Sequence, residues 1–203
     1  MTIRLVVGPP GSGKTYCSVA RALDRCRRGG QVFCNFTLRH PNAERITVED
    51  LLDPDMPAGL VVLDEAHLWF PSRLAMQLPP SLLMKASQTR KMGWDMDLIA
   101  QHESRIDKVW RDNANVIEVC RAWFGGDVNR PGSPLFFTTR TYEPHLVRKV
   151  DKAIGKRTLR MRRDIAQAYD TTETLTVAGH VSARRDHYTN PEVPLSALRR
   201  VAT

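Results

Sequence analysis

The chain has no long apolar run. None of its hydrophobic stretches approaches the roughly 18 residues that a membrane-spanning helix needs. Its first residues, MTIRLVVGPPG, are also too short and too polar for the apolar centre of a secretory signal. We therefore expect no transmembrane segment in this chain. Internal repeats and low-complexity segments are absent as well, and a length of 203 residues suits one well-cored domain with a small appendage.

Cysteine is scarce, and its spacing argues against two kinds of site. The four cysteines show no CxxC or CxxxxC spacing; they are Cys17, Cys26, Cys34 and Cys120. The pattern therefore predicts neither a disulfide framework nor a zinc site, but small apolar side chains buried in a protein of the reducing cytoplasm. Hydrophobic residues at 42% and charged residues at 26% are typical of an ordinary soluble globular protein.

Acidic residues are almost missing from one segment. Between Arg148 and Arg163, eight basic residues are opposed only by Asp151, and the whole chain carries a formal net charge of +8. We interpret this segment as a basic helical stretch. Its simplest explanation is a solvated helix face, but it also suits a polyanion such as nucleic acid, or an acidic membrane surface. Both interpretations stay open on composition alone.

Short apolar runs alternate with helical patterns along most of the chain. We expect strands at Ile3–Val7, Gln31–Phe36, Leu60–Leu63, Asp97–Ala100, Val116–Cys120 and Leu135–Tyr142. Helices are expected after residue 13, at Thr47 (which opens a capping box), over Ser81–Lys91 and over Ser104–Trp110. This alternation predicts an α/β fold with a mostly parallel sheet flanked by helices and an additional strand at its C-terminal edge. We assign residues 1–145 to the core, 146–175 to a basic helical extension of it, and 176–203 to a loosely ordered or partner-packing tail.

The stretch GPPGSGKT fits G-x-x-x-x-G-K-[ST] at every fixed position, and it lies between an apolar strand and a helix. In such a P-loop the glycines let successive backbone N–H groups point at phosphate oxygens. We expect Lys14 to reach the β- and γ-phosphates of ATP and the Thr15 hydroxyl to bind Mg²⁺. The residues expected to hold the nucleotide are Gly8, Pro9, Pro10, Gly11, Ser12, Gly13, Lys14, Thr15 and Tyr16. A plain glycine-rich turn is the alternative.

The stretch LVVLDEAHLWF brings two carboxylates to the end of a buried strand. Ligands of open α/β sheets bind at that end. We therefore expect Asp64 to hold the hydrated Mg²⁺, and the adjacent Glu65 to act as the general base or water-positioning group. A solvated strand end is the alternative for this carboxylate pair. His67 and His102 lie near the same rim, where a structural role is the simpler expectation.

Gln101 ends the strand expected beside the one that carries Asp64, where an amide can contact the γ-phosphate or the attacking water. Capping of the following helix explains it nearly as well. An arginine from a neighbouring subunit often meets the charge of the transferred phosphoryl group. Arg90 and Arg111 are the preferred candidates, with Arg105 and Arg121 as others. For each of them a surface salt bridge is the alternative.

With these residues in place, the chain resembles the zonular occludens toxin (Zot) family, the ATPase domains of filamentous-phage gene I assembly proteins in the FtsK–HerA lineage. The segments that carry the resemblance are GPPGSGKTY, VVLDEAHLWFPSR, SQTRKMGWDMDLIAQHESRIDKVWRDNA and the late YDTTE. The resemblance spans about residues 1–175 and implies a RecA-like P-loop NTPase fold. Family members continue into a membrane-spanning helix that this chain lacks. We therefore expect either a cytoplasmic part of such a protein or a relative of phage genome-packaging ATPases.

The resemblance implies an ATP-hydrolysing motor that moves viral DNA during virion assembly, by extrusion or by packaging. We expect it to act as a homo-oligomeric ring, a hexamer, with ATP and Mg²⁺ as cofactors. The expected partners are viral DNA, in contact with residues 148–163, and other phage assembly, capsid or membrane proteins. The expected location is the host cytoplasm, its membrane face or the virion packaging vertex. Alternatives are a nucleotide-binding assembly scaffold, a small-molecule kinase, and a DEAH-type helicase, for which about eighty residues after Cys120 leave too little chain for a second domain.

Overall fold

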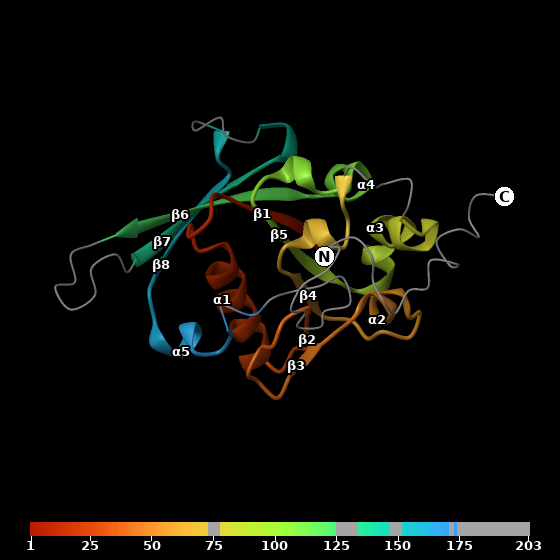
Figure 1. The fold of residues 1–203 in the computed structure, drawn as a ribbon, viewed down its shortest axis with the longest axis horizontal. Coiled ribbons are helices and arrows are strands. Elements are labelled where there is room, and N and C mark those ends of the chain that lie inside the picture. The colour runs from red at the N-terminus through yellow and green to blue at the C-terminus, as the bar shows by residue number, and fades with distance from the viewer. Residues whose placement is uncertain (73–77, 125–133, 147–151, 171–172, 174–203) are drawn as a thin grey trace.

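One sheet of eight strands organises the chain (Figure 1). The computed structural model describes residues 1–72, 78–124, 134–146, 152–170 and 173. The strands follow the order β3-β2-β4-β5-β1-β6-β7-β8 across the sheet. Their bounds are Ile3–Val7 for β1, Val32–Cys34 for β2, Ala43–Arg45 for β3, Leu60–Leu63 for β4, Asp95–Ala100 for β5, Val116–Phe124 for β6, Pro134–Tyr142 for β7 and Gly155–Arg160 for β8.

The strands from β3 to β6 are all parallel, whereas β7 and β8 extend the sheet antiparallel to their neighbours. The central strands are nearly continuous apolar runs because helices cover both faces of a parallel sheet. All four residues of β4 are buried, for example. The α/β fold with a mostly parallel sheet is confirmed, and so is the additional strand at the C-terminal edge.

Helices cover the two faces of the sheet and close two separate apolar cores. Their bounds are Lys14–Arg27 for α1, Val48–Leu52 for α2, Pro80–Met92 for α3, Lys108–Asp112 for α4 and Arg163–Ala166 for α5. Helices α1 and α5 lie on one face, whose core includes Val6 and Val19 (Figure 1). Helices α3 and α4 pack on the other face, whose core includes Leu5, Leu82 and Trp110. Thr47 caps α2 through the expected reciprocal bonds with Asp50.

The basic segment corrects one prediction, because it is not a basic helix. Residues 155–160 form strand β8, which pairs with β7, and only Arg163–Ala166 is helical. The side chains of Lys156, Arg157 and Arg160 are exposed on an edge strand. Exposed charge looks the same on a helix and on an edge strand, so composition did not distinguish the two. Residues 147–151, which include part of the predicted stretch, lie outside the described residues.

The late YDTTE segment returns to the opposite edge of the sheet. Tyr169 is buried against Phe36, with ring centroids 6.3 Å apart. Glu173 accepts a hydrogen bond from the backbone N–H of Thr37 at 3.0 Å and pairs with Arg45 at 3.1 Å. These contacts therefore hold the end of the described chain against β3 and the residues that follow β2. The predicted tail, 176–203, lies outside the described residues.

Two further observations concern membrane-spanning helices and the cysteines. In the part of the chain that the structure describes, no helix has the length and apolarity to cross a membrane. All four cysteines are unpaired and buried.

Candidate active site

The P-loop joins the end of β1 to the first turn of α1. Gly13 has a left-handed backbone with φ of 83°, and a side chain there would meet the Phe137 ring, so only glycine fits. Helix α1 begins at Lys14 with no side-chain cap and no acid in its first turn. Its first N–H groups therefore keep the partial positive charge that favours an anion. The Ser12 hydroxyl in this loop is buried without a hydrogen-bond partner among the described residues.

Thr15 and Asp64 meet although the chain separates them by 49 residues. The Thr15 hydroxyl donates a hydrogen bond of 2.8 Å to Asp64 Oδ2, while Lys14 Nζ donates one of 3.1 Å to the Pro9 carbonyl. Burial raises the pKa of Asp64, against the Thr15 bond that lowers it, and the neighbouring Glu65 raises it further. A buried carboxylate beside a hydroxyl is a suitable oxygen pair for Mg²⁺, and a divalent cation would offset the cost of its charge.

Glu65 occupies an unusual backbone conformation. Its φ and ψ are both 46°, and it is the one residue other than glycine with positive φ in the described ranges. Such strain tends to be retained where it positions a functional side chain. His67 Nδ1 lies 3.2 Å from Glu65 Oε2. This contact lowers the pKa of Glu65, burial opposes it, and the charges of Lys14 and Arg105 lower it further, so the carboxylate is ionised at neutral pH.

Asn35 is a buried residue that the sequence did not single out. It follows β2, and its side-chain amide binds both backbone polar groups of Asp64. The Oδ1 atom accepts from the Asp64 N–H and the Nδ2 atom donates to the Asp64 carbonyl, each at 2.8 Å. Asn35 has no solvent exposure. This pair of bonds holds the turn in which Asp64 and Glu65 lie, because the two groups would otherwise be partly buried without partners.

Replacing Asn35 with alanine is expected to loosen that turn. The change removes two hydrogen bonds, and each unsatisfied group costs about 1–3 kcal/mol. We expect a lower unfolding temperature and a reduced rate of ATP hydrolysis at saturating ATP, measured by phosphate release. Asn113→Ala is the matched control, since its amide makes one bond of 2.8 Å to the Val109 carbonyl. Equal losses in the two variants would show that Asn35 does not position the turn.

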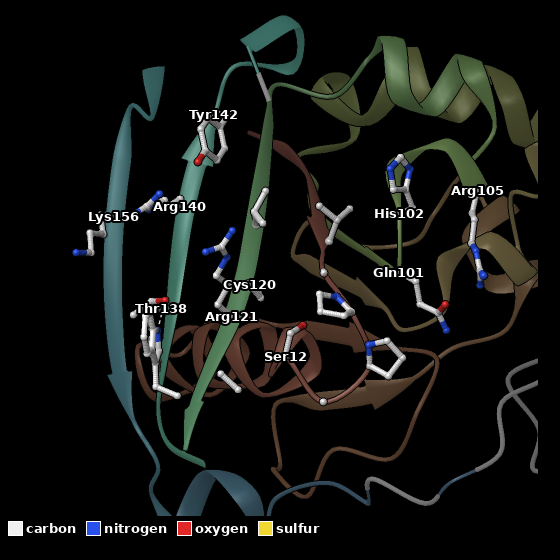
Figure 2. A pocket seen from close by; sticks show the side chains of 18 residues that line it. Ser12, Gln101, His102, Arg105, Cys120, Arg121, Thr138, Arg140, Tyr142 and Lys156 are labelled. Carbon is white, nitrogen blue, oxygen red and sulfur yellow. Dashed lines mark hydrogen bonds between the residues drawn. The ribbon is translucent and has the colours of Figure 1, made fainter. Parts of the chain in front are cut away.

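A pocket of about 880 Å³ borders the P-loop on the face opposite α1. Gln101, His102 and Arg105 line it on one side of the loop, and basic residues of β6, β7 and β8 line it on the other (Figure 2). Gln101 directly follows β5, which pairs with β4, and its carbonyl accepts from the Gly8 N–H at 3.3 Å. The amide therefore lies at the expected strand end, and its contact with a nucleotide stays a prediction.

Arg90 and Arg111 do not lie at the P-loop of their own chain. Arg90 is in the last turn of α3, which ends two residues before β5, and Arg111 is in the short α4 that precedes β6. Both helices therefore end at the edge where the central strands begin. The five residues of β1 separate that edge from the P-loop, a distance of roughly 16 Å. Either arginine would have to act on a neighbouring subunit.

The eight-stranded sheet, the P-loop at the end of β1 and the paired Thr15 and Asp64 define a P-loop NTPase fold. The sequence model of the zonular occludens toxin (Zot) family matches residues 43–175, and the chain belongs to this family.

Several phage proteins are similar to this chain in sequence. The Gene 1 protein of Salmonella phage IKe is 30% identical over 147 residues, which cover 60% of this chain and 40% of that protein. The Gene 1 protein of Enterobacteria phage M13 is 29% identical over 147 residues, covering 60% and 42%. The matched region thus spans about two fifths of these relatives.

Two solved structures share the fold at low sequence identity. The N-terminal domain of zonular occludens toxin from Neisseria meningitidis matches with a TM-score of 0.61 and 19% identity, covering 83% of this chain and 98% of that one. The genome packaging NTPase B204 of Sulfolobus turreted icosahedral virus 2, in complex with ATP-gammaS, matches with a TM-score of 0.53 and 11% identity, covering 79% and 98%.

Proposed function

We propose that this protein hydrolyses ATP with Mg²⁺ and that hydrolysis drives the movement of viral DNA during virion assembly. The observation that carries the proposal is the contact of Thr15 with Asp64 beside an uncapped α1, with Glu65 next in the chain. Membership of the Zot family supports it. The name of the similar packaging NTPase points in the same direction, although at 11% identity that likeness carries the fold alone.

Each group at the P-loop would have its own role in hydrolysis. The N–H groups at the start of α1 and the Lys14 ammonium would bind the phosphates, because both carry positive charge toward the loop. Glu65, ionised at neutral pH, would orient a water molecule and accept its proton. Gln101 would hold the same water from the end of β5. An adjacent acidic residue that activates water favours hydrolysis over transfer to a small molecule.

Mg²⁺ would be held by Thr15 and Asp64. In the described part of the chain, no group of three or more His, Cys, Asp or Glu side chains forms a complete metal site. That agrees with Mg²⁺, which usually takes one or two protein ligands together with phosphate oxygens and water. When bound, the ion would offset negative charge on the phosphates.

Replacing Lys14 with alanine tests the proposal. Charge-assisted hydrogen bonds contribute about 1.5–3 kcal/mol, so we expect ATP affinity to fall by roughly ten- to a hundredfold. The ATP-dependent rise in unfolding temperature should disappear at moderate ATP concentration, and phosphate release should stop. Lys108→Ala, which removes an equal charge from an exposed site, is the control. Unchanged phosphate release by the Lys14 variant would refute the proposed activity.

We propose a homo-oligomeric ring, a hexamer, as the working form. Arg90 and Arg111 support it, since both lie at the edge of the sheet away from their own P-loop and would meet only a neighbour's nucleotide. Particle mass in ATP and Mg²⁺ measures this, and a monomer under those conditions would contradict it. The same proposal includes other phage assembly, capsid or membrane proteins as partners. It also includes a location in the host cytoplasm, at the inner face of the membrane or at the virion packaging vertex.

A further inference from the structure

Among the described residues, no helix covers the part of the β6, β7 and β8 face that points away from α1. Alternate residues of these strands, such as Cys120 and Phe137, join the core beneath α1. The residues between them lie on the opposite face of the sheet. In the described part of the chain, the helices on that face do not extend beyond β1 to cover β6, β7 and β8 (Figure 1). We call this the open sheet face; its residues by strand register are Val119, Arg121, Trp123, Phe136, Thr138, Arg140, Lys156, Thr158 and Arg160.

Two neighbouring aromatic rings are partly exposed on the open sheet face. Trp123 is 49% exposed and Phe136 is 36% exposed, and their stacked rings have centroids 6.1 Å apart at an interplanar angle of 18°. The Trp123 Nε1 donates a hydrogen bond of 2.9 Å to the Thr138 hydroxyl, which fixes the indole. The side chains therefore form a pre-ordered aromatic surface in water, an arrangement suited to a flat ligand.

Positive charge lies close to these rings, and no carboxylate of the described residues neutralises it. Arg140 pairs directly across the strands with Lys156, and Arg121 lies one strand away. Like charges opposite each other destabilise a sheet. None of these side chains forms an ion pair with a carboxylate within the described ranges, and the open sheet face itself contains no acidic residue. An anionic ligand would relieve this repulsion.

The open sheet face is connected to the P-loop in two ways. Arg121, Arg140 and Lys156 line the same pocket as the outer surface of the loop (Figure 2). Phe137, between two residues of the open sheet face, turns to the other side and packs 4.6 Å from the Tyr16 ring of α1. The Tyr16 hydroxyl also donates to the Arg160 carbonyl at 2.9 Å. Strands β7 and β8 are therefore packed against, and hydrogen-bonded to, the helix that follows the P-loop.

We propose that the open sheet face binds single-stranded nucleic acid. Bases would stack on Trp123 and Phe136, while phosphates would contact Arg121, Arg140 and Lys156. Aromatic side chains in a basic groove are the usual means of binding single strands. Stacking on such rings needs bases that are free of a duplex, which selects a single strand over double-stranded DNA. This inference rests on the proposed function for its biological meaning, and it names the surface on which the moved strand would lie.

The fluorescence of Trp123 gives a direct test of binding by the full chain without ATP. The other three tryptophans, Trp69, Trp94 and Trp110, are fully buried, so a surface quencher reports on Trp123. We expect an oligo-thymidylate of about 20 nucleotides, longer than one such site needs, to quench this fluorescence. By anisotropy of the labelled oligonucleotide, Trp123→Ala should weaken binding about tenfold or more, and Trp123→Phe should restore most of it.

Charge and competitor controls make the result specific. Arg140→Ala should lower the slope of log affinity against log salt by about 0.7, as expected for one lost phosphate contact with a single strand. Arg28→Ala, which changes a side chain 76% exposed directly after α1, should leave the affinity unchanged. Equal affinity for a duplex of the same sequence, or wild-type binding by Trp123→Ala, would overturn the proposal. Quenching of Trp123 by ATP alone would also overturn it, since the rings would then hold the base of the bound nucleotide.

The binding test and the hydrolysis test fail separately. Oligonucleotide binding is measured without ATP, so a protein that does not hydrolyse ATP still tests the open sheet face. If both proposals hold, oligo-thymidylate should increase phosphate release by the wild-type chain, and this increase should be absent in Trp123→Ala. Normal stimulation in that variant would show that the strand binds elsewhere.

Discussion

Replacing Glu65 with glutamine is expected to lower the rate of ATP hydrolysis by roughly 10²- to 10⁴-fold, the usual contribution of a positioned general base. Glutamine keeps the size and the left-handed backbone position of the side chain but cannot accept a proton from water. Nucleotide binding should survive, because Lys14, Thr15 and the start of α1 are unchanged. Phosphate release measures the first effect, and the rise in unfolding temperature with ATP measures the second.

The chain supplies a matched control for this variant. Glu143 and His145 form a surface pair with the same spacing as Glu65 and His67, at 3.4 Å compared with 3.2 Å. Glu143→Gln should leave hydrolysis unchanged. Normal hydrolysis by Glu65→Gln would mean that another group activates the water, and the assignment of Glu65 would then be wrong.

The pH profile adds a readout for His67. Contact with His67 lowers the pKa of Glu65, so the carboxylate stays ionised and able to accept a proton at lower pH than usual. In His67→Ala that pKa should rise toward its ordinary value. The acidic limb of the rate profile should therefore shift to higher pH, with little change near neutral pH. A structural role alone would lower the rate at every pH and leave the limb in place.

Replacing Asp97 with alanine is expected to cause the largest loss of stability, about 3–5 kcal/mol of unfolding free energy. The Asp97 side chain is fully buried on β5 and pairs with both Arg4 on β1 and Arg21 on α1. Glu118 on β6 binds the same two arginines, at 3.3 Å and 2.8 Å. Burial opposes the charge of Arg21, but the two carboxylates outweigh it and raise its pKa.

Loss of Asp97 would leave two largely buried guanidinium groups with a single carboxylate between them. Urea denaturation measures the change in unfolding free energy. Asp24→Ala is the control, since its pair with Arg28 has side chains 52% and 76% exposed and should contribute less than about 1 kcal/mol. A loss no larger than that of the control would show that the cluster does not hold β5, β1, β6 and α1 together.

The parts of the fold that sequence predicted well depend on local signals. A buried strand, a glycine-rich loop and a helix follow one another in GPPGSGKT and its flanks, so β1 and α1 could be placed within a residue or two. Strand β3 was missed because Ala43–Arg45 has only three residues, none of them buried. The same absence of an apolar pattern made β8 look helical. Edge strands with exposed polar side chains leave little periodicity to detect.

The site was predictable where a motif names the residue and not where partners are distant in sequence. Thr15 and Asp64 follow from two motifs. Asn35 did not, because one polar residue after a short strand has no distinctive pattern; its role depends on pairing between β2 and β4. A charged residue inside each of three buried strands was the available signal for the Asp97 cluster. The places of Arg90 and Arg111 also follow from chain direction, since a helix that precedes a parallel strand ends where that strand starts.

The central place of β1 has a consequence for synthesis on the ribosome. In the sheet, β1 is bordered by two strands that are made much later than β1 itself: Thr2 bonds to Asp95 across 93 residues, and Ile3 bonds to Asn115 across 112. Contacts so distant in sequence form slowly. The nascent chain must therefore carry β1 without its neighbours until both have emerged. We expect the P-loop to bind nucleotide only after that point, so ATP should stabilise chains in which β5 and β6 have been made and not shorter ones.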